Sequence, residues 1–227
     1  MRNLYILSIL FLLAACAPFD YSPAPNPPQP FTIIHTPALA WMQDTLHLCA
    51  TANPKIALRV EELPVSALEI GAADAILKLG TNPEELINNA HATLLGWEYI
   101  TIISSPDISP SQLELPDLKI LYSTVEPTYQ AWIYPQGSEL STIFRQQILA
   151  DEATSPHLLI APDPQAMLEA ISTQPNSVGF LPQSWLAEGV ALNNIQGDYR
   201  QPILALTKSE PVGLTVEFLK CLEELLP

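Results

Sequence analysis

Between residue 31 and the C-terminus, short runs of β-branched and aromatic residues alternate with segments of helical spacing. The runs typical of strands are residues 31–35, 56–60, 73–79, 96–105, 130–134, 157–161, 177–181, 190–195 and 203–207. The segments typical of helices are residues 37–50, 64–70, 83–89, 115–121, 138–150, 164–173 and 211–226. Because strands that alternate with helices of this length pack as a sheet covered by helices, the sequence predicts an α/β fold with mainly parallel pairing.

Two segments share one construction, in which a strand runs directly into a helix start. In FTIIHTPALAW the helix begins at Pro37 after Thr36, and in WIYPQGSELSTIF it begins after Gly137-Ser138. Each junction places unpaired N–H groups, a hydroxyl and the positive end of a helix dipole at the carboxyl end of a strand. That combination binds anions without Lys or Arg, and ligand crevices of open α/β sheets lie at these edges. The alternative is that Thr36 and Ser138 are ordinary N-caps.

The second of these helices has an amphipathic pattern. Leu140, Phe144 and Ile148 recur at every fourth position, which places them on one face of a helix. We expect this face to be buried, and Ser138 to cap the helix whether or not it also contacts a ligand.

Six segments of the chain resemble, in order and spacing, those of a known family. GWEYITIISSPD is similar to the strand that enters the family's second lobe, and LPDLKILYS to its short helix. EPTYQAW is similar to its Trp-containing segment, and YPQGSELSTIFRQQIL to its second-lobe ligand loop and helix. DPQAMLEAISTQPNSVGFLPQSWL resembles its helix followed by a Gly-aromatic strand, and YRQPILALT resembles its return strand. Most of residues 31–227 thus resembles the phosphate-type substrate-binding proteins of ABC transporters, which have the type II periplasmic binding fold.

The resemblance implies two α/β lobes joined by crossing strands, with a hinge between the lobes and a ligand enclosed between them. Lobe I would comprise residues 31–94 and 190–227, and lobe II residues 95–189. The residues that the resemblance places around the ligand are Thr36, Ala38, Lys78, Gly137, Ser138 and Glu139. For Lys78, which matches a third loop of the family, the alternative is a solvated lysine at the end of a strand.

The sequence departs from the phosphate binders of this family at both ligand loops. Those proteins have a Ser-Gly-Thr turn with an Arg nearby, whereas the turn here is Gly137-Ser138-Glu139. Glu139 adds a negative charge at the anion position, although it also suits the first turn of a helix. In the first loop, Pro37 lacks an N–H that an oxyanion would use. These departures favour either a different ligand or a pair of lobes that no longer binds tightly.

The N-terminus predicts export and anchoring. A basic start at Met1-Arg2-Asn3 precedes an apolar run at residues 4–13, which is too short to span a bilayer. Leu13-Ala14-Ala15-Cys16 resembles the bacterial lipoprotein signal, which implies a signal peptide over residues 1–15 and lipidation of Cys16. The alternative is an ordinary secretory signal. Residues 16–30 are rich in Pro and predict an extended tether of roughly 40 Å. The expected location is the extracytoplasmic face of the bacterial cell membrane.

The remaining cysteines are candidates for a disulfide. Export places the chain in an oxidising compartment, and Cys49 and Cys221 form an even pair there. Each lies on an apolar helical face, so both are equally compatible with being small buried hydrophobic residues.

Charge and motifs exclude several classes of function. A net charge of −15 makes nucleic acid an unfavourable partner. The four histidines show no metal-ligand spacing and no serine lies in a nucleophile elbow, so we predict no metal, no cofactor and no enzyme. The predicted function is a monomeric, lipid-anchored solute-binding protein that delivers a small ligand, such as an oxyanion, to an ABC permease. The alternative is an envelope lipoprotein that uses the same fold for sensing or protein interaction.

Overall fold

The computed structural model describes residues 27–80, 90–108, 114–124, 129–150, 153–193 and 199–226. Its strands are β1 (Gln29–His35), β2 (Ile56–Glu62), β3 (Ala75–Leu79), β4 (His91–Ser104), β5 (Gln130–Ile133), β6 (Leu159–Ile160), β7 (Ser177–Pro182), β8 (Ala191–Asn193) and β9 (Arg200–Thr207). Its α-helices are α2 (Gln43–Ala52), α4 (Leu115–Ser123), α5 (Glu139–Gln147), α6 (Pro164–Thr173) and α7 (Leu214–Leu225). Short 3₁₀ helices are η1 (Pro37–Met42), η2 (Val65–Ala67) and η4 (Gln183–Trp185). The mixed α/β fold predicted from the alternating pattern is confirmed.

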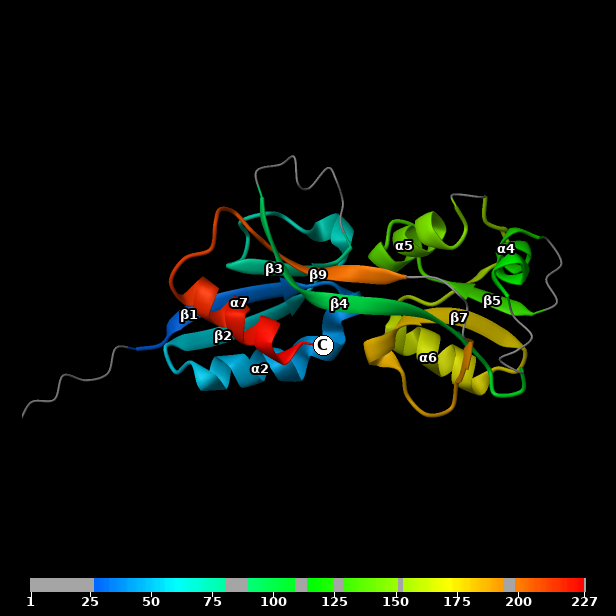
Figure 1. Ribbon diagram of the computed structural model, residues 1–227, viewed down its shortest axis with the longest axis horizontal. Helices are drawn as coiled ribbons and strands as arrows, with labels where there is room; N and C mark the ends of the chain where they lie inside the picture. The colour runs from blue at the N-terminus through cyan, green and yellow to red at the C-terminus, as the bar shows by residue number, and fades with distance from the viewer. Residues whose placement is uncertain are drawn as a thin grey trace, which may run out of the picture.

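The strands form one hydrogen-bonded path that extends through two lobes. Their order is β2-β1-β3-β9-β4-β7-β5-β6, and β8 also pairs with β4. Figure 1 shows lobe I, with β1, β2, β3, α2 and α7, beside lobe II, with β5, β7, α4, α5 and α6. The long strand β4 runs from one lobe into the other.

The expectation of mainly parallel pairing is wrong. Among the described strands, β1 pairs in parallel with β2 and β3, and β5 pairs in parallel with β6 and β7. The four other pairings, β3–β9, β4–β9, β4–β7 and β4–β8, are antiparallel. All four involve β4 or β9, because these strands run against the direction of their neighbours where the chain passes between lobes.

Strand β4 is the physical link between the lobes. Its residues 91–99 pair with β9 in lobe I, with a register shift between Leu94 and Gly96, and its residues 100–104 pair with β7 in lobe II. Strand β8 pairs with Ile102–Ser104 at the lobe II end. The chain therefore returns to lobe I at β9, later than the predicted return at residue 190.

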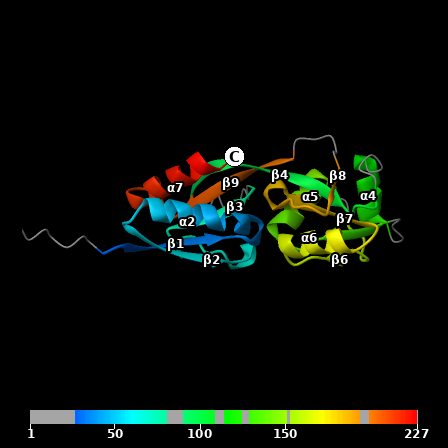
Figure 2. The ribbon, with the colours of Figure 1, turned by 90° about the horizontal axis from the view of Figure 1, so that it is seen from below.

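Helices α2 and α7 lie side by side on lobe I, as Figure 2 shows. A disulfide joins Cys49 of α2 to Cys221 of α7, with 5.8 Å between the Cα atoms. The ring of Phe218 in α7 also lies 4.9 Å from the ring of Phe31 in β1. The disulfide thus connects α2, near the start of the described sequence, to α7, near its end.

In lobe II, β7 lies between helices on both faces. On one side Phe180 stacks on Phe144 of α5, with 3.9 Å between ring centroids. On the other side a Cβ atom at Gly179 would lie 2.5 Å from the sulfur of Met167 in α6. Glycine at this position therefore allows α6 to approach the strand closely.

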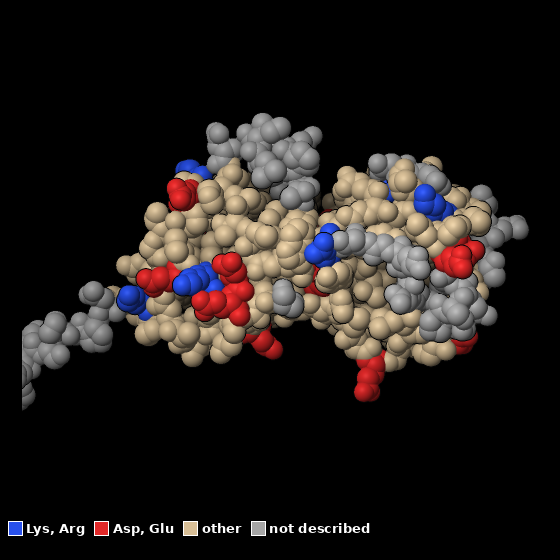
Figure 3. Space-filling view, viewed as in Figure 1, with Lys and Arg blue, Asp and Glu red and all other residues tan. Residues whose placement is uncertain are grey.

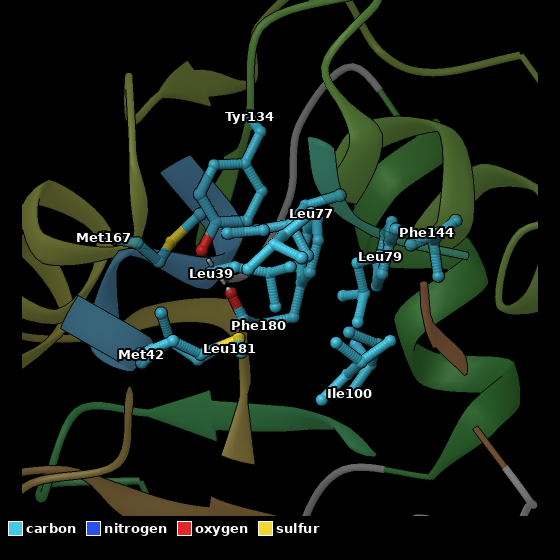
Figure 4. Close-up of a cluster of buried hydrophobic side chains, with 14 of the residues drawn as sticks. Leu39, Met42, Leu77, Leu79, Ile100, Tyr134, Phe144, Met167, Phe180 and Leu181 are labelled. Carbon is cyan, nitrogen blue, oxygen red and sulfur yellow. Dashed lines mark hydrogen bonds between the residues drawn. The ribbon is translucent and has the colours of Figure 1, made fainter. Parts of the chain in front are cut away.

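Apolar side chains from the two lobes share one core. The buried cluster includes Leu39 and Leu77 of lobe I together with Phe180 and Leu181 of lobe II. Figure 4 shows these side chains packed together, beside the Tyr134 hydroxyl that donates to the Phe180 carbonyl at 2.9 Å. The lobes therefore meet through apolar packing as well as through their connecting strands.

Several element boundaries differ from those expected. The helix predicted over 37–50 is η1 followed by α2, the one over 64–70 is only η2, and the strand over 157–161 is only β6. Strand β1 begins at Gln29, inside the predicted tether, because Gln29 N–H donates to the Lys55 carbonyl at 2.7 Å. The predicted signal peptide, Cys16, most of the tether and the helix over 83–89 lie outside the described residues. Within the described part of the chain, no helix has the length and apolar character needed to cross a membrane.

Candidate ligand-binding cleft between the lobes

The lobe II side of the cleft is the turn that connects β5 to α5. The Ser138 N–H donates to the Pro135 carbonyl at 3.0 Å, and Gly137 adopts φ +83°, which favours glycine. Ser138 has extended backbone angles, and its hydroxyl accepts from the Ser141 N–H at 3.2 Å. Ser138 is therefore an N-cap, and Glu139 is the first residue of the helix.

Glu139 crosses from lobe II to lobe I. One carboxylate oxygen accepts a hydrogen bond from the Thr36 hydroxyl at 2.7 Å. The other accepts from the Leu79 N–H at 2.6 Å. Glu139 is only 8% exposed, and both donors are buried. One carboxylate thus joins the ends of β1 and β3 in lobe I to the start of α5 in lobe II.

The side chain of Thr36 does not have the role that its position in the sequence favours. Its backbone is extended ahead of η1, but its side chain makes no capping hydrogen bond. The hydroxyl donates to Glu139 instead. Thr36 is therefore the N-cap residue of η1 by position, and its carbonyl accepts from the Leu39 N–H at 3.0 Å, but the expected side-chain cap is absent because the hydroxyl is directed at a charged acceptor in the other lobe.

A pocket of about 250 Å³ lies beside this carboxylate. It is lined by residues 36–38 and 64–66 of lobe I and by residues 134–140 and 162–164 of lobe II. Five of these residues are prolines: Pro37, Pro64, Pro135, Pro162 and Pro164. The walls therefore contain many rigid, apolar surfaces and offer few backbone N–H donors.

The structure brings five of the six predicted ligand residues to this pocket. They are Thr36, Ala38, Gly137, Ser138 and Glu139. Lys78 is not among the residues that line it, and its backbone pairs with Leu204 of β9. The alternative of a solvated lysine is wrong, because Lys78 is only 4% exposed. The backbone N–H of the next residue, Leu79, donates to the cleft carboxylate.

Two cleft features were missed in the sequence. Pro162, Asp163 and Pro164 line the pocket, and the Asp163 carboxylate caps α6 by accepting from the Ala166 N–H at 2.8 Å. This is a third junction of a strand with a capped helix, so the rule applied to the first two would have found it. The second feature is a hydrogen bond from the Trp185 indole N–H to the Ala38 carbonyl at 2.9 Å, for which the sequence offered no pattern.

Charged side chains give the cleft no basic character. On the face shown in Figure 3, charged side chains of both signs lie in small groups separated by neutral surface. Among the described residues that line the pocket there is no Lys or Arg, whereas Glu139 and Asp163 are both acidic. A ligand in this pocket therefore meets hydrogen-bonding groups and negative charge.

A buried carboxyl group lies in the strand that links the lobes. Glu98 of β4 is 2% exposed, and one oxygen accepts from the N–H groups of Tyr99 at 2.9 Å and Ser184 at 3.4 Å. Burial raises the pKa of Glu98 above its ordinary value of 4.5, and hydrogen bonds from Ser184 and Tyr99 offset this only in part. The folded protein therefore binds a proton at Glu98 more tightly than the unfolded chain does.

This raised pKa predicts a pH-dependent loss of stability. The contribution of Glu98 is fully present below about pH 4.5 and is lost as the pH rises through its folded-state pKa. We expect Glu98→Gln, which cannot ionise, to gain stability relative to the wild type over that interval and to keep a constant difference above it. Urea unfolding at several pH values measures this. The exposed Glu169→Gln is the control, and parallel stability curves for Glu98→Gln and the wild type would contradict the assignment.

Together, the two lobes, the linking strands and the pocket between the lobes define a type II periplasmic-binding-protein-like fold. No protein-family model matches the chain, and no curated protein matches it. The comparison with solved structures therefore supplies the fold alone.

Solved structures of two kinds are similar to this chain. A protein described as a phosphate ABC transporter substrate-binding protein with bound phosphate, from Clostridium perfringens, has a TM-score of 0.74 and 15% identity, over 85% of this chain and 92% of that one. A phosphate transport receptor from Vibrio cholerae has a TM-score of 0.64 and 16% identity, over 85% and 93%. A variant OxyR2 regulatory domain with bound sulfate, from Vibrio vulnificus, has a TM-score of 0.67 and 12% identity, over 88% and 97%. These neighbours are binding proteins and regulatory domains, not enzymes.

Proposed function

We propose that this chain is an extracytoplasmic binding protein that captures a small ligand in the pocket between its lobes. The observation that carries the proposal is that the pocket is lined from both lobes, at the carboxyl ends of strands and at helix starts. A ligand bound there contacts both lobes at once, so its binding energy favours the closed arrangement over an open one.

The proposal includes anchoring by Cys16 and delivery of the ligand to an ABC permease. Support for anchoring comes from the lipoprotein-like sequence Leu13-Ala14-Ala15-Cys16. Support for export comes from the disulfide between Cys49 and Cys221, since such bonds persist in oxidising compartments. Support for transport comes from the two solved structures described as phosphate transport proteins.

A second candidate is a non-transport envelope lipoprotein that uses the closed pair of lobes for sensing or protein interaction. The contact of Glu139 with Thr36 and Leu79 favours it, because the protein's own side chain already bridges the lobes. The similarity to an OxyR2 regulatory domain is compatible with the same reading.

A panel of small molecules distinguishes the two candidates. It contains phosphate, sulfate, molybdate and tungstate, organic acids, and uncharged and cationic organic compounds such as sugars, amino acids and polyamines. Since a ligand that binds only the native state raises the melting temperature, we expect at least one compound at millimolar concentration to raise it. No shift with any compound would contradict capture of a small ligand and favour the second candidate.

A pair of tryptophan variants controls for binding elsewhere on the protein. Ser66 lines the pocket and is exposed, so Ser66→Trp is expected to fill the mouth of the pocket at little cost in stability. Ala67 is its exposed neighbour outside the pocket lining, so Ala67→Trp adds the same ring without obstruction. Ser66→Trp should abolish the ligand-induced shift and Ala67→Trp should retain it. Equal shifts in both variants would place the binding site elsewhere.

A further inference from the structure

Glu139 lies where the strand-to-helix junction at Thr36 meets the one at Gly137-Ser138. The sequence predicted an anion-binding position at each of these junctions. We propose that the Glu139 carboxylate occupies the oxyanion position of the cleft and acts as a specificity-determining residue, so that the pocket beside it takes an uncharged or cationic organic ligand. This inference rests on the proposed function of the pocket, and it adds which chemical class of ligand the pocket binds and which it excludes.

The contacts of the carboxylate are those that a bound oxyanion would make. Its two oxygens accept from the Thr36 hydroxyl at 2.7 Å and from the Leu79 N–H at 2.6 Å. The same side chain extends from the first residue of α5, where helix N–H groups and the helix dipole favour negative charge. The ends of β1 and β3 and the start of α5 therefore surround one carboxylate. That carboxylate belongs to the protein itself and not to a bound anion.

Burial stabilises the two hydrogen bonds to the Glu139 carboxylate. Glu139 is more than nine-tenths buried, and the Thr36 and Leu79 donors are almost completely buried. Removal of the carboxylate would leave the Leu79 N–H without its acceptor, which is costly in a buried site. A free oxyanion would have to displace a carboxylate that is already bound and tethered at high effective concentration.

The remaining space also disfavours a second anion. The pocket includes Asp163 as well as Glu139, and no Lys or Arg is among its described lining residues. Like charges placed close together in a partly desolvated site repel strongly. The proline-rich walls suit the apolar part of an organic molecule, while the carboxylates suit its hydrogen-bond donors or its positive charge.

The test is a gain of oxyanion binding. Wild-type protein, Glu139→Ala and Glu139→Gln are titrated with sodium phosphate and sodium sulfate by isothermal calorimetry, after circular dichroism has checked folding. Ala vacates the position, and we expect it to bind at least one of these anions roughly tenfold or more tightly than the wild type. Gln fills the position without charge and keeps an acceptor for the Leu79 N–H, so we expect no comparable gain. Equal gains in Ala and Gln would overturn occupancy as the mechanism.

Two further variants keep the test decisive. Glu139→Ser replaces Glu139→Ala if the latter does not fold, because a short hydroxyl side chain also vacates the position. Glu169→Ala removes one exposed negative charge from the same lobe, so a similar gain there would mean that net charge alone is responsible. Phosphate or sulfate binding by the wild type in the pocket, sensitive to Ser66→Trp, would overturn this inference and leave the proposed function intact. A gain in Glu139→Ala with no panel ligand for the wild type would support occupancy of the oxyanion position by Glu139, but it would contradict the proposed function and with it the choice of an uncharged or cationic ligand.

Discussion

Removal of the disulfide between Cys49 and Cys221 is expected to lower the free energy of unfolding by about 2–5 kcal/mol. The bond closes a loop with a sequence separation of 172 residues, and the chain-entropy estimate for so long a loop lies near the upper end of that range. Its direct effect is on lobe I, where it joins α2 to α7 over the face of the sheet. Urea unfolding of the oxidised protein, the reduced protein and the double variant Cys49→Ala/Cys221→Ala measures the loss.

The double variant separates the bond from the effect of free thiols. If the reduced protein and the double variant lose similar stability, the cross-link is responsible; if only the double variant loses it, packing of the sulfur atoms is responsible. Iodoacetamide should modify neither Cys49 nor Cys221 before reduction and both after it under denaturing conditions. An unfolding midpoint unaffected by reduction would contradict the prediction.

Phe144→Ala is expected to lower the free energy of unfolding by about 3–5 kcal/mol. Phe144 is completely buried, with its ring stacked on Phe180 at 3.9 Å and tilted against Tyr122 at 4.7 Å. Truncation removes both contacts and leaves a cavity between α5, α4 and β7. Because α5 carries Ser138 and Glu139, looser packing of this helix should also weaken any ligand binding in the pocket.

The matched control is Gln146→Ala, an exposed position on the same helix, which should change the free energy of unfolding by no more than about 0.5 kcal/mol. Denaturant unfolding and the ligand-induced shift in melting temperature are measured on both variants. Equal stability losses at the two positions would contradict the assignment of Phe144 to the core of lobe II.

Local patterns predicted α5 well. Its spacing placed Leu140, Phe144 and Ile148 on a buried face, and all three are buried. Ser138 was expected to cap the helix, and its hydroxyl accepts from Ser141 three residues later. These features are predictable because each depends on helical periodicity or on groups within one turn of the chain.

Thr36 and Lys78 show that local sequence patterns do not predict contacts between the lobes. Thr36 precedes a helix in the manner of an N-cap, yet its hydroxyl donates to Glu139, 103 residues away. Lys78 matches a cleft loop in the resemblance but does not line the pocket, whereas the backbone N–H of its neighbour Leu79 donates to Glu139. Sequence patterns do not report which backbone group faces another lobe.

The sequence alone determined the alternating strands and helices, the two helix starts that border the cleft, and the presence of a negative charge at Glu139. Each of these follows from residue type and short-range spacing. Only the tertiary structure decided that this carboxylate points into the protein and accepts hydrogen bonds from Thr36 and Leu79 of the other lobe. The physical reason is that a carboxylate in the first turn of a helix interacts favourably with the helix dipole whether it faces solvent or the protein interior. Its direction is set by buried donors that the fold brings together from distant parts of the chain.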